Sequence, residues 1–227
     1  MRSGSDARET FVLVVGRWRA LALAGISLAA LTALQPAAQA QVMASLPANP
    51  GVASLEATGT AKPVHAWLDF CNRYAGECDV NPSEPAVLTM TPQLWKTLNT
   101  VNRQVNASIK PRTDMDHWGV VDRWDIPTDG YGDCEDYQLL KRKILTEKHG
   151  VSKRALRMTV VVDDQGEGHA VLMVRTTSGE LILDNKRSTI LSWSDTGYLF
   201  VKREGQDGRD WVSLGDRSAS PTTTANP

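Results

Sequence analysis

The 227-residue sequence contains few of the residue types that would assign it to a protein class at once. It has three cysteines, four histidines and 6% aromatic residues, and its formal net charge is only −1. A charge so close to zero gives no electrostatic basis for binding nucleic acid or an acidic membrane, so no nucleic-acid partner is expected. With 41% hydrophobic and 22% charged residues, the composition indicates a soluble globular protein, long enough for one domain plus extensions.

The N-terminal segment has the pattern of a targeting sequence. Arg17 and Arg19 precede an apolar run over 21–34, and the tripeptide "AQA" ends at Ala40. A run of about 14 residues is short for a membrane-spanning helix, which needs roughly 20. The order of basic, apolar and small residues is typical of a secretory signal. We therefore predict that residues 1–40 are a cleaved signal peptide and that the mature protein is periplasmic; an uncleaved anchor is the alternative.

All three cysteines lie beyond this segment. Cys71 and Cys78 are seven positions apart, and Gly76 between them allows a turn. Because nearby thiols tend to form a disulfide in an oxidising compartment, we expect this pair to be bridged. Cys134 is then left unpaired, and an odd cysteine in an exported protein is a candidate reactive thiol.

Two helices are predicted in the first half of the domain. Thr91 is a natural N-cap and Pro92 suits the first helical position, and apolar residues then recur at helical spacing. A second helix is predicted over 134–149, with Gly150 directly after its end. Residues 112–132 between them show no period, and a stretch of this length without a period is often functional.

The second half of the chain is predicted to form strands. Apolar segments separated by short polar turns occupy 155–164, 169–176, 180–185, 197–204 and 210–214. Helices followed by an antiparallel meander predict an α+β fold. We expect a flexible leader over 41–62, one domain over 63–215 and a disordered tail over 216–227.

The run "GYGDCEDY" places Cys134 among three acids. Asp133 occupies the expected N-cap position, and Glu135 and Asp136 follow the cysteine. A helix N-terminus stabilises a thiolate, whereas three adjacent carboxylates oppose it. From these residues alone, two other interpretations stay open: the cysteine is a small buried apolar residue, and the acids serve only as caps that complement the helix dipole.

A histidine and an aspartate near strand ends are candidate partners for this thiol. His169 opens one predicted strand beside glycines, and Asp184 ends the next, where a carboxylate has no packing purpose. A two-residue turn at 178–179 would pair Asp184 with Met173, on the same face as His169 but four residues further along. Direct contact would then require a wider loop or a bulge.

These motifs resemble a known family. "GYGDCEDYQLLKRKIL" with "GHAVLMVRTTSGELILDN" is similar to the bacterial transglutaminase-like cysteine proteinases, and the likeness extends through "VNRQVN", "HWGVVDRW" and "FCNRYAGEC". The resemblance implies a papain-like fold whose nucleophile lies on a helix packed against an antiparallel sheet. By motif position it assigns the nucleophile to Cys134, the base to His169 and the orienting acid to Asp184.

The resemblance also implies a metal, a substrate and a regulator. Members of the family bind Ca²⁺ beside the nucleophile, which assigns Asp133, Glu135 and Asp136 as ligands. They cleave large surface adhesins near small residues and are held inactive by an inner-membrane receptor that senses cyclic di-GMP. We therefore predict a calcium-dependent periplasmic cysteine endopeptidase. The alternatives are a transglutaminase-type acyl transferase with the same triad, and a non-catalytic calcium-binding module that recognises a partner through the tryptophan-containing loop.

Overall fold

The computed structural model describes residues 54–206 and 209–215, which form helices packed on a seven-stranded antiparallel sheet. The strand order is β1-β9-β8-β4-β5-β6-β7. The strands are β1 (Gly59–Ala61), β4 (Leu156–Val162), β5 (Gly168–Thr176), β6 (Gly179–Leu183), β7 (Leu191–Ser192), β8 (Leu199–Glu204) and β9 (Trp211–Ser213). The predicted signal peptide (1–40) and tail (216–227) lie outside the described residues.

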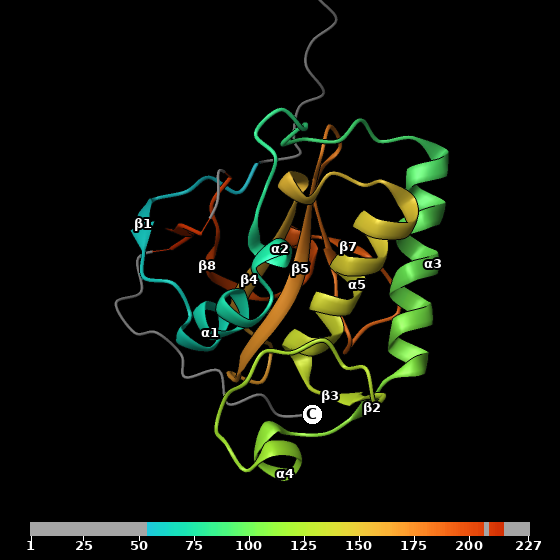
Figure 1. Cartoon of the computed structure of the whole chain (residues 1–227). Helices are drawn as coiled ribbons and strands as arrows, with labels where there is room; N and C mark the ends of the chain where they lie inside the picture. The colour runs from blue at the N-terminus through green and yellow to red at the C-terminus, as the bar shows by residue number, and fades with distance from the viewer. Residues whose placement is uncertain (1–53, 207–208, 216–227) are drawn as a thin grey trace, which may run out of the picture. The chain divides into compact units, whose positions relative to one another are not determined.

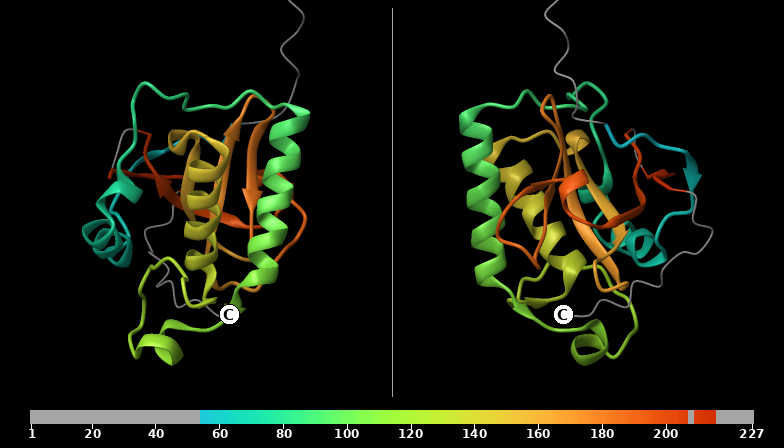
Figure 2. Two further views of the ribbon diagram at one scale, coloured as in Figure 1. Left: turned by 45° about the vertical axis from the view of Figure 1, so that its right-hand side comes forward. Right: turned by 180° about the vertical axis from the view of Figure 1, so that it is seen from behind.

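Two long helices lie side by side over one face of this sheet (Figures 1 and 2). The helices are α1 (His65–Arg73), α2 (Ala75–Cys78), α3 (Pro92–Ser108), α4 (Asp114–Trp118) and α5 (Cys134–His149), with single 3-10 turns η1 (Lys153–Ala155) and η2 (Trp193–Asp195). A small parallel pair joins β2 (Lys110–Pro111) to β3 (Tyr131–Gly132). The α+β class predicted from the sequence is confirmed.

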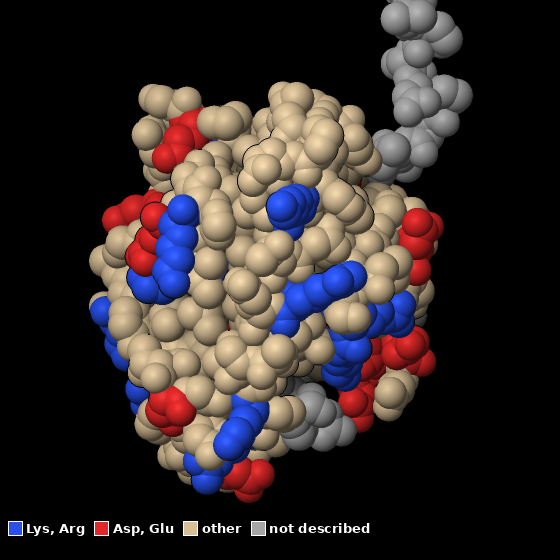
Figure 3. All heavy atoms as spheres, turned by 90° about the vertical axis from the view of Figure 1, so that its right-hand side faces the viewer, with Lys and Arg blue, Asp and Glu red and all other residues tan. Residues whose placement is uncertain are grey.

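The outer of the two long helices, α3, forms as its sequence predicts. The Thr91 hydroxyl accepts a hydrogen bond from the backbone N–H of Leu94 at 3.0 Å, and Pro92 occupies the first helical position. Its inner face buries Leu98, Val101 and Val105 completely or nearly so. The sequence of α3 contains no acidic residue, and Figure 3 shows Lys and Arg among uncharged side chains in the middle of this face, with Asp and Glu toward its edges.

The second long helix, α5, lies between α3 and β5. Every side chain of its first six residues is buried, from Cys134 to Leu139. Gly150 ends the helix in the left-handed conformation with φ 62°, as expected of a residue at this position. The start of α5, which carries Cys134, is therefore enclosed by the sheet and by the loops that cover it.

The central strands are buried on both faces. Val160 belongs to the main core beneath the helices, whereas its neighbour Val161 belongs to a second apolar cluster on the opposite face. That second cluster also contains Val171, Met173, Ile182, Phe200 and Leu214. Burial on two sides fixes the position of β5, which carries His169, relative to the rest of the sheet.

The predicted meander is correct only as far as β7. The chain then crosses back over the sheet, and β8 pairs with the free edge of β4, with Val161 opposite Phe200. Strand β9 pairs with β8, and β1 pairs with β9. Because β1 was expected to belong to a flexible leader, that prediction is wrong at its C-terminal end: Gly59 pairs with Ser213 at the edge of the sheet.

The segment 112–132 also contains a helix that the sequence analysis missed. Thr113 caps α4 by accepting a hydrogen bond from the N–H of Asp116, and Gly119 ends the helix with φ 69°. The five-residue length is too short to show a hydrophobic period. The helix is nevertheless important, because its first residue, Asp114, lies beside the start of α5.

The predicted disulfide is present and joins two helices. Cys71 in α1 and Cys78 in α2 are bonded, with their Cα atoms 5.5 Å apart. Cys134 is unpaired, as predicted, and it is buried. Over the described parts of the chain, no helix is both long and apolar enough to cross a membrane.

Candidate active site and acidic cluster

Cys134 is the first residue of α5, and its side chain points against the start of β5. Asp133 before it is extended, so the helix begins at the cysteine itself. The backbone N–H of Ala170 donates a hydrogen bond to Cys134 Sγ at 3.3 Å, and the thiol donates to Glu135 Oε2 at 3.1 Å. The candidate nucleophile therefore contacts both the strand that carries His169 and a carboxylate of its own helix.

The surroundings of Cys134 favour the protonated thiol. Burial raises its pKa well above the ordinary value, and the charges of Glu135 and Asp133 raise it further. A thiolate at this position therefore needs these carboxylate charges to be compensated. The sequence analysis identified this conflict, and the buried geometry makes it more severe.

His169 and Asp184 are in direct contact, which the register inferred from the sequence did not allow. His169 Nε2 lies 2.8 Å from Asp184 Oδ1, and both side chains are buried. The β5–β6 turn is one residue earlier than expected: Thr176 pairs with Gly179, and Met173 pairs with Ile182 rather than with Asp184. This shift brings the aspartate two residues nearer to the histidine, so no bulge or wider loop is needed.

Three donors hold the Asp184 carboxylate. Its Oδ1 also accepts a hydrogen bond from the backbone N–H of Lys186 at 2.9 Å, and its Oδ2 accepts one from the Tyr198 hydroxyl at 2.7 Å. Burial alone would raise its pKa, but the bond to His169 and the other donors lower the pKa of Asp184 to about 2. Tyr198 was not singled out from the sequence, because it directly precedes β8, whose place in the sheet is not apparent from the sequence.

The ionised Asp184 determines which nitrogen of His169 carries a proton. A carboxylate can only accept hydrogen bonds, so Nε2 is the donor and Nδ1 of the neutral ring holds the lone pair. His169 Nδ1 is buried and has no hydrogen-bond partner among the residues that the structure describes. This nitrogen is therefore available to accept a proton.

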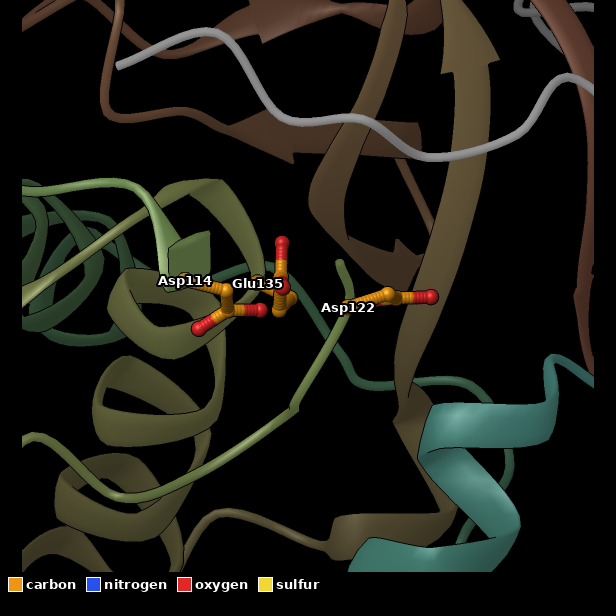
Figure 4. Close-up of side chains that lie close together, drawn as sticks. All are labelled: Asp114, Asp122 and Glu135. Atoms are coloured by element: carbon orange, nitrogen blue, oxygen red, sulfur yellow. The ribbon is translucent and has the colours of Figure 1, made fainter. Parts of the chain in front are cut away.

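A cluster of five carboxylates surrounds the start of α5; we call it the acidic cluster. It consists of Asp114, Asp122, Asp133, Glu135 and Asp136, of which all but Asp122 are buried. Carboxylate oxygens of Asp114, Asp122 and Glu135 lie within 4.8 Å of one another, and Figure 4 shows these side chains side by side. Oxygens of Asp114, Asp133 and Asp136 meet the same limit. The three predicted ligands thus lie around Asp114.

The hydrogen bonds of this cluster do not match a simple capping role. The Asp133 side chain makes no cap bond to α5; its Oδ2 accepts one from the N–H of Asp114 at 3.3 Å. Asp136 Oδ1 accepts a hydrogen bond from the N–H of Asp125 at 2.7 Å. Asp133 Oδ1 and Glu135 Oε1 are buried without a hydrogen-bond partner in the described chain, and such oxygens are free to bind a cation.

The pKa values of these carboxyl groups also indicate a cation-binding site. Burial, followed by the charge of Asp114, raises the pKa of Asp133 to about 7. Burial and the charge of Asp133 raise the pKa values of Glu135 and Asp136 well above their ordinary range. Ca²⁺ takes six to eight oxygen ligands of all kinds, and hard carboxylate oxygens suit it, so the donor set fits this ion.

Asp114 and Asp122 are functional candidates that the sequence analysis did not name. Neither is contiguous with the cysteine motif, so only the folded loop brings them to it. The available signal was the aperiodic segment 112–132, which contains both. Gly132 is also required here: a Cβ at this position would lie 2.6 Å from Asp136 Oδ2, so only glycine allows Asp136 to pack there.

Asp125 anchors the loop that carries Asp122. Its carboxylate accepts hydrogen bonds from the Arg73 guanidinium at 2.8 Å, from the Tyr74 hydroxyl at 2.7 Å and from Arg123 at 3.0 and 3.1 Å. Arg73 and Tyr74 lie at the end of α1, beside the disulfide-linked turn. The disulfide therefore supports, through α1, the loop that closes over the acidic cluster.

A helix that presents an N-terminal cysteine to an antiparallel sheet is the arrangement expected of a transglutaminase-like cysteine protease. The family model of the bacterial transglutaminase-like cysteine proteinases (BTLCP) matches residues 56–219. The chain belongs to this family and is a cysteine protease.

Solved structures of Legionella pneumophila LapG are similar to part of the chain. One has 30% sequence identity and a TM-score of 0.45, and covers 55% of this chain and 69% of LapG. A calcium-bound form has 30% identity and a TM-score of 0.47, with 60% and 78% covered. An EGTA-treated form has 28% identity and a TM-score of 0.46, with 58% and 72% covered. A comparison with curated proteins gives no match.

Proposed function

We propose that this protein is a calcium-dependent periplasmic endopeptidase that uses Cys134, His169 and Asp184 as its catalytic triad. The observation that carries the proposal is the bond from His169 Nε2 to Asp184 Oδ1 at 2.8 Å, which leaves Nδ1 buried and without a partner among residues 54–206 and 209–215. The contact of Cys134 Sγ with the N–H of Ala170, the residue after His169, supports the assignment of the nucleophile.

In this mechanism His169 accepts the thiol proton on Nδ1, and Cys134 Sγ attacks the carbonyl carbon of the scissile peptide bond. Asp184 holds the ring in the correct tautomer and stabilises its positive charge. His169 then donates the proton to the leaving amine, and a water molecule that it activates hydrolyses the acyl-enzyme thioester. Backbone N–H groups at the start of α5 are suited to stabilise the oxyanion.

The acidic cluster would hold the calcium ion in this proposal. When bound, the ion supplies positive charge that offsets the carboxylates beside the thiol. Asp133, Glu135 and Asp136 would bind it from α5, and Asp114 and Asp122 from the preceding loop. The two buried carboxylate oxygens without hydrogen bonds support this assignment.

The proposed substrate is a large cell-surface protein of the adhesin type, cleaved near small residues. The proposed regulator is an inner-membrane receptor that responds to cyclic di-GMP. Family membership supports a protein substrate. The apolar run and "AQA" within residues 1–40 support export to the periplasm.

The direct test compares cell-surface proteins from strains that express wild-type enzyme or the C134A variant, with and without EGTA. We expect surface proteins to acquire new N-termini only with the wild-type enzyme and only with calcium present. Unchanged surface proteins in every comparison would contradict the proposal. Adding a primary amine and searching for conjugates by mass spectrometry separates hydrolysis from acyl transfer.

A further inference from the structure

The segment that follows β6 carries Asp184 and is held by side chains of a neighbouring helix; we call residues 184–188 the acid turn. Asn106 Nδ2 on α3 donates hydrogen bonds to the carbonyl oxygens of Asp184 at 2.8 Å and of Arg187 at 3.2 Å. Both donors of this one amide are therefore used on the acid turn.

A second asparagine, one helical turn earlier, makes a parallel set of contacts. Asn102 Nδ2 lies 3.3 Å from the carbonyl oxygens of both Arg187 and Ser188. Residues four apart lie on the same helix face, so "VNRQVN" presents two amides in one direction. Asn102 is fully buried, although asparagine is an uncommon residue for a helix core.

The chemistry of the partners fixes the orientation of these amides. A backbone carbonyl only accepts hydrogen bonds, so the atom that faces it must be the amide nitrogen rather than the oxygen. The three carbonyls would otherwise lack these bonds in a partly buried setting, which is unfavourable. The two asparagines therefore act as a clamp on the backbone of the acid turn.

Helix α5 adds a third contact to the same turn. The fully buried Lys141 Nζ donates to Gln138 Oε1 at 3.0 Å, so the opposite end of the Gln138 amide faces Asn185 Oδ1, at 3.1 Å. Gln138 lies one turn after Cys134. The helix that carries the candidate nucleophile and the turn that carries the candidate acid are thus joined through one amide.

The backbone of the acid turn in turn determines where the carboxylate lies. The N–H of Lys186 donates to Asp184 Oδ1, the same oxygen that contacts His169 Nε2. A displacement of this backbone would therefore move the carboxylate away from the imidazole.

We propose that Asn102 and Asn106 are positioning residues of the protease: they clamp the acid turn so that Asp184 holds His169 in its working orientation. The inference rests on the proposed roles of His169 and Asp184. It predicts that the asparagines act on the reaction only through Asp184, and this separates positioning from a general contribution to stability.

The test measures the rate at which iodoacetamide alkylates Cys134, the one cysteine outside the disulfide, in calcium-loaded protein at neutral pH. The variants are N106A, D184A, the double variant and N99A. The last is a matched control, because Asn99 donates only within α3, to the carbonyl of Trp95. We expect N106A to be alkylated about tenfold more slowly, because small misplacement of a catalytic group has effects of this size or larger.

The double variant should react no more slowly than D184A alone, and N99A should react like wild type. In ¹H–¹⁵N spectra the His169 Nε2–H signal should broaden or shift in N106A and not in N99A. N106D is nearly isosteric with the wild type, but its carboxylate repels the two carbonyl oxygens. It should therefore show the same slower alkylation and the same change in the His169 signal as N106A.

Wild-type alkylation and an unchanged His169 signal in N106A and N106D would overturn the clamp proposal. A further tenfold loss in the double variant would overturn it too, and failure of both variants to fold would assign Asn106 to folding instead. Wild-type reactivity of D184A would contradict the proposed triad itself, so the two failures are distinguishable.

Discussion

The thiol of Cys134 donates its hydrogen bond to Glu135 Oε2 at 3.1 Å, so the candidate nucleophile and a candidate calcium ligand share a proton. In the proposed mechanism, this contact couples the acidic cluster directly to the thiol of Cys134. The hydrogen bond to Glu135 and the charge of its carboxylate favour the protonated thiol, because they raise the pKa of Cys134. A cation bound to the carboxylate would weaken it as an acceptor and favour the thiolate. In the proposed mechanism, proteolysis therefore depends on metal binding at Glu135.

The first prediction concerns Asp184. D184N keeps the shape of the side chain but removes its charge and disturbs the His169 tautomer. We expect kcat/KM for peptide cleavage to fall by about 10³–10⁴-fold, as for other triads. The control is D164N, which changes an exposed aspartate that pairs with Arg187. Activity in D184N within threefold of wild type would remove Asp184 from the triad.

The same carboxylate predicts a stability change in acid. Its folded pKa of about 2 lies below the unfolded value of about 4, so it contributes stability above pH 4 that is lost as the pH falls toward 2. Wild type should therefore lose more unfolding free energy than D184N between pH 4 and pH 2. Parallel losses in thermal unfolding experiments would contradict the assignment.

The metal-free protein should show the opposite trend at higher pH. The pKa of Asp133 is raised to about 7, so this group contributes stability below pH 4 that is lost as the pH rises through 7. In EGTA we expect Tm to fall between pH 4.5 and pH 7.5. Calcium should abolish the fall, and at 100 times its Kd should add about 2.7 kcal/mol to the unfolding free energy. Identical curves with calcium and with EGTA would contradict a calcium site.

Asp114 provides the most specific test of the acidic cluster. It belongs to both groups of converging carboxylates, so D114N should weaken calcium binding by at least tenfold in isothermal titration calorimetry. Asp116, two residues further along α4 and exposed, is the matched control, and D116N should bind calcium like wild type. Equal affinities of the two variants would exclude Asp114 as a ligand.

Gly132 should be intolerant of even a methyl group. In G132A the new Cβ would lie 2.6 Å from Asp136 Oδ2, so the carboxylate must move. We expect a loss of about 1–3 kcal/mol of unfolding free energy, together with weaker calcium binding. G76A is the control, since a Cβ there meets nothing within 4 Å. A stable G132A variant with normal calcium affinity would show that Asp136 is not held as described.

Local features of the fold could be predicted from the sequence because their causes are local. Thr91 and Pro92 specify the start of α3, Gly150 specifies the end of α5, and the spacing of Cys71 and Cys78 predicts their disulfide. The crossover of β8 to β4 could not be predicted, since strand order depends on which edge is free after the earlier elements have packed.

The contacts of the candidate site are likewise either local, and predictable from the sequence, or long-range, and not predictable from it. Cys134, Glu135 and Asp136 lie in one contiguous motif, so their proximity is local. The contact between His169 and Asp184 depends on a one-residue difference in turn position, which composition does not determine. Asp114 and Asp122 join the cluster only through the folded loop.

The most direct measurement is mass spectrometry of new N-termini, with purified calcium-loaded wild type and C134S incubated separately with detached cell-surface proteins. The serine variant changes one atom of a buried side chain, so its Tm should stay close to that of wild type. We expect new N-termini with wild type, and none with C134S or with wild type in EGTA. The same new N-termini in the C134S sample would contradict the claim that Cys134 is the nucleophile of this protease.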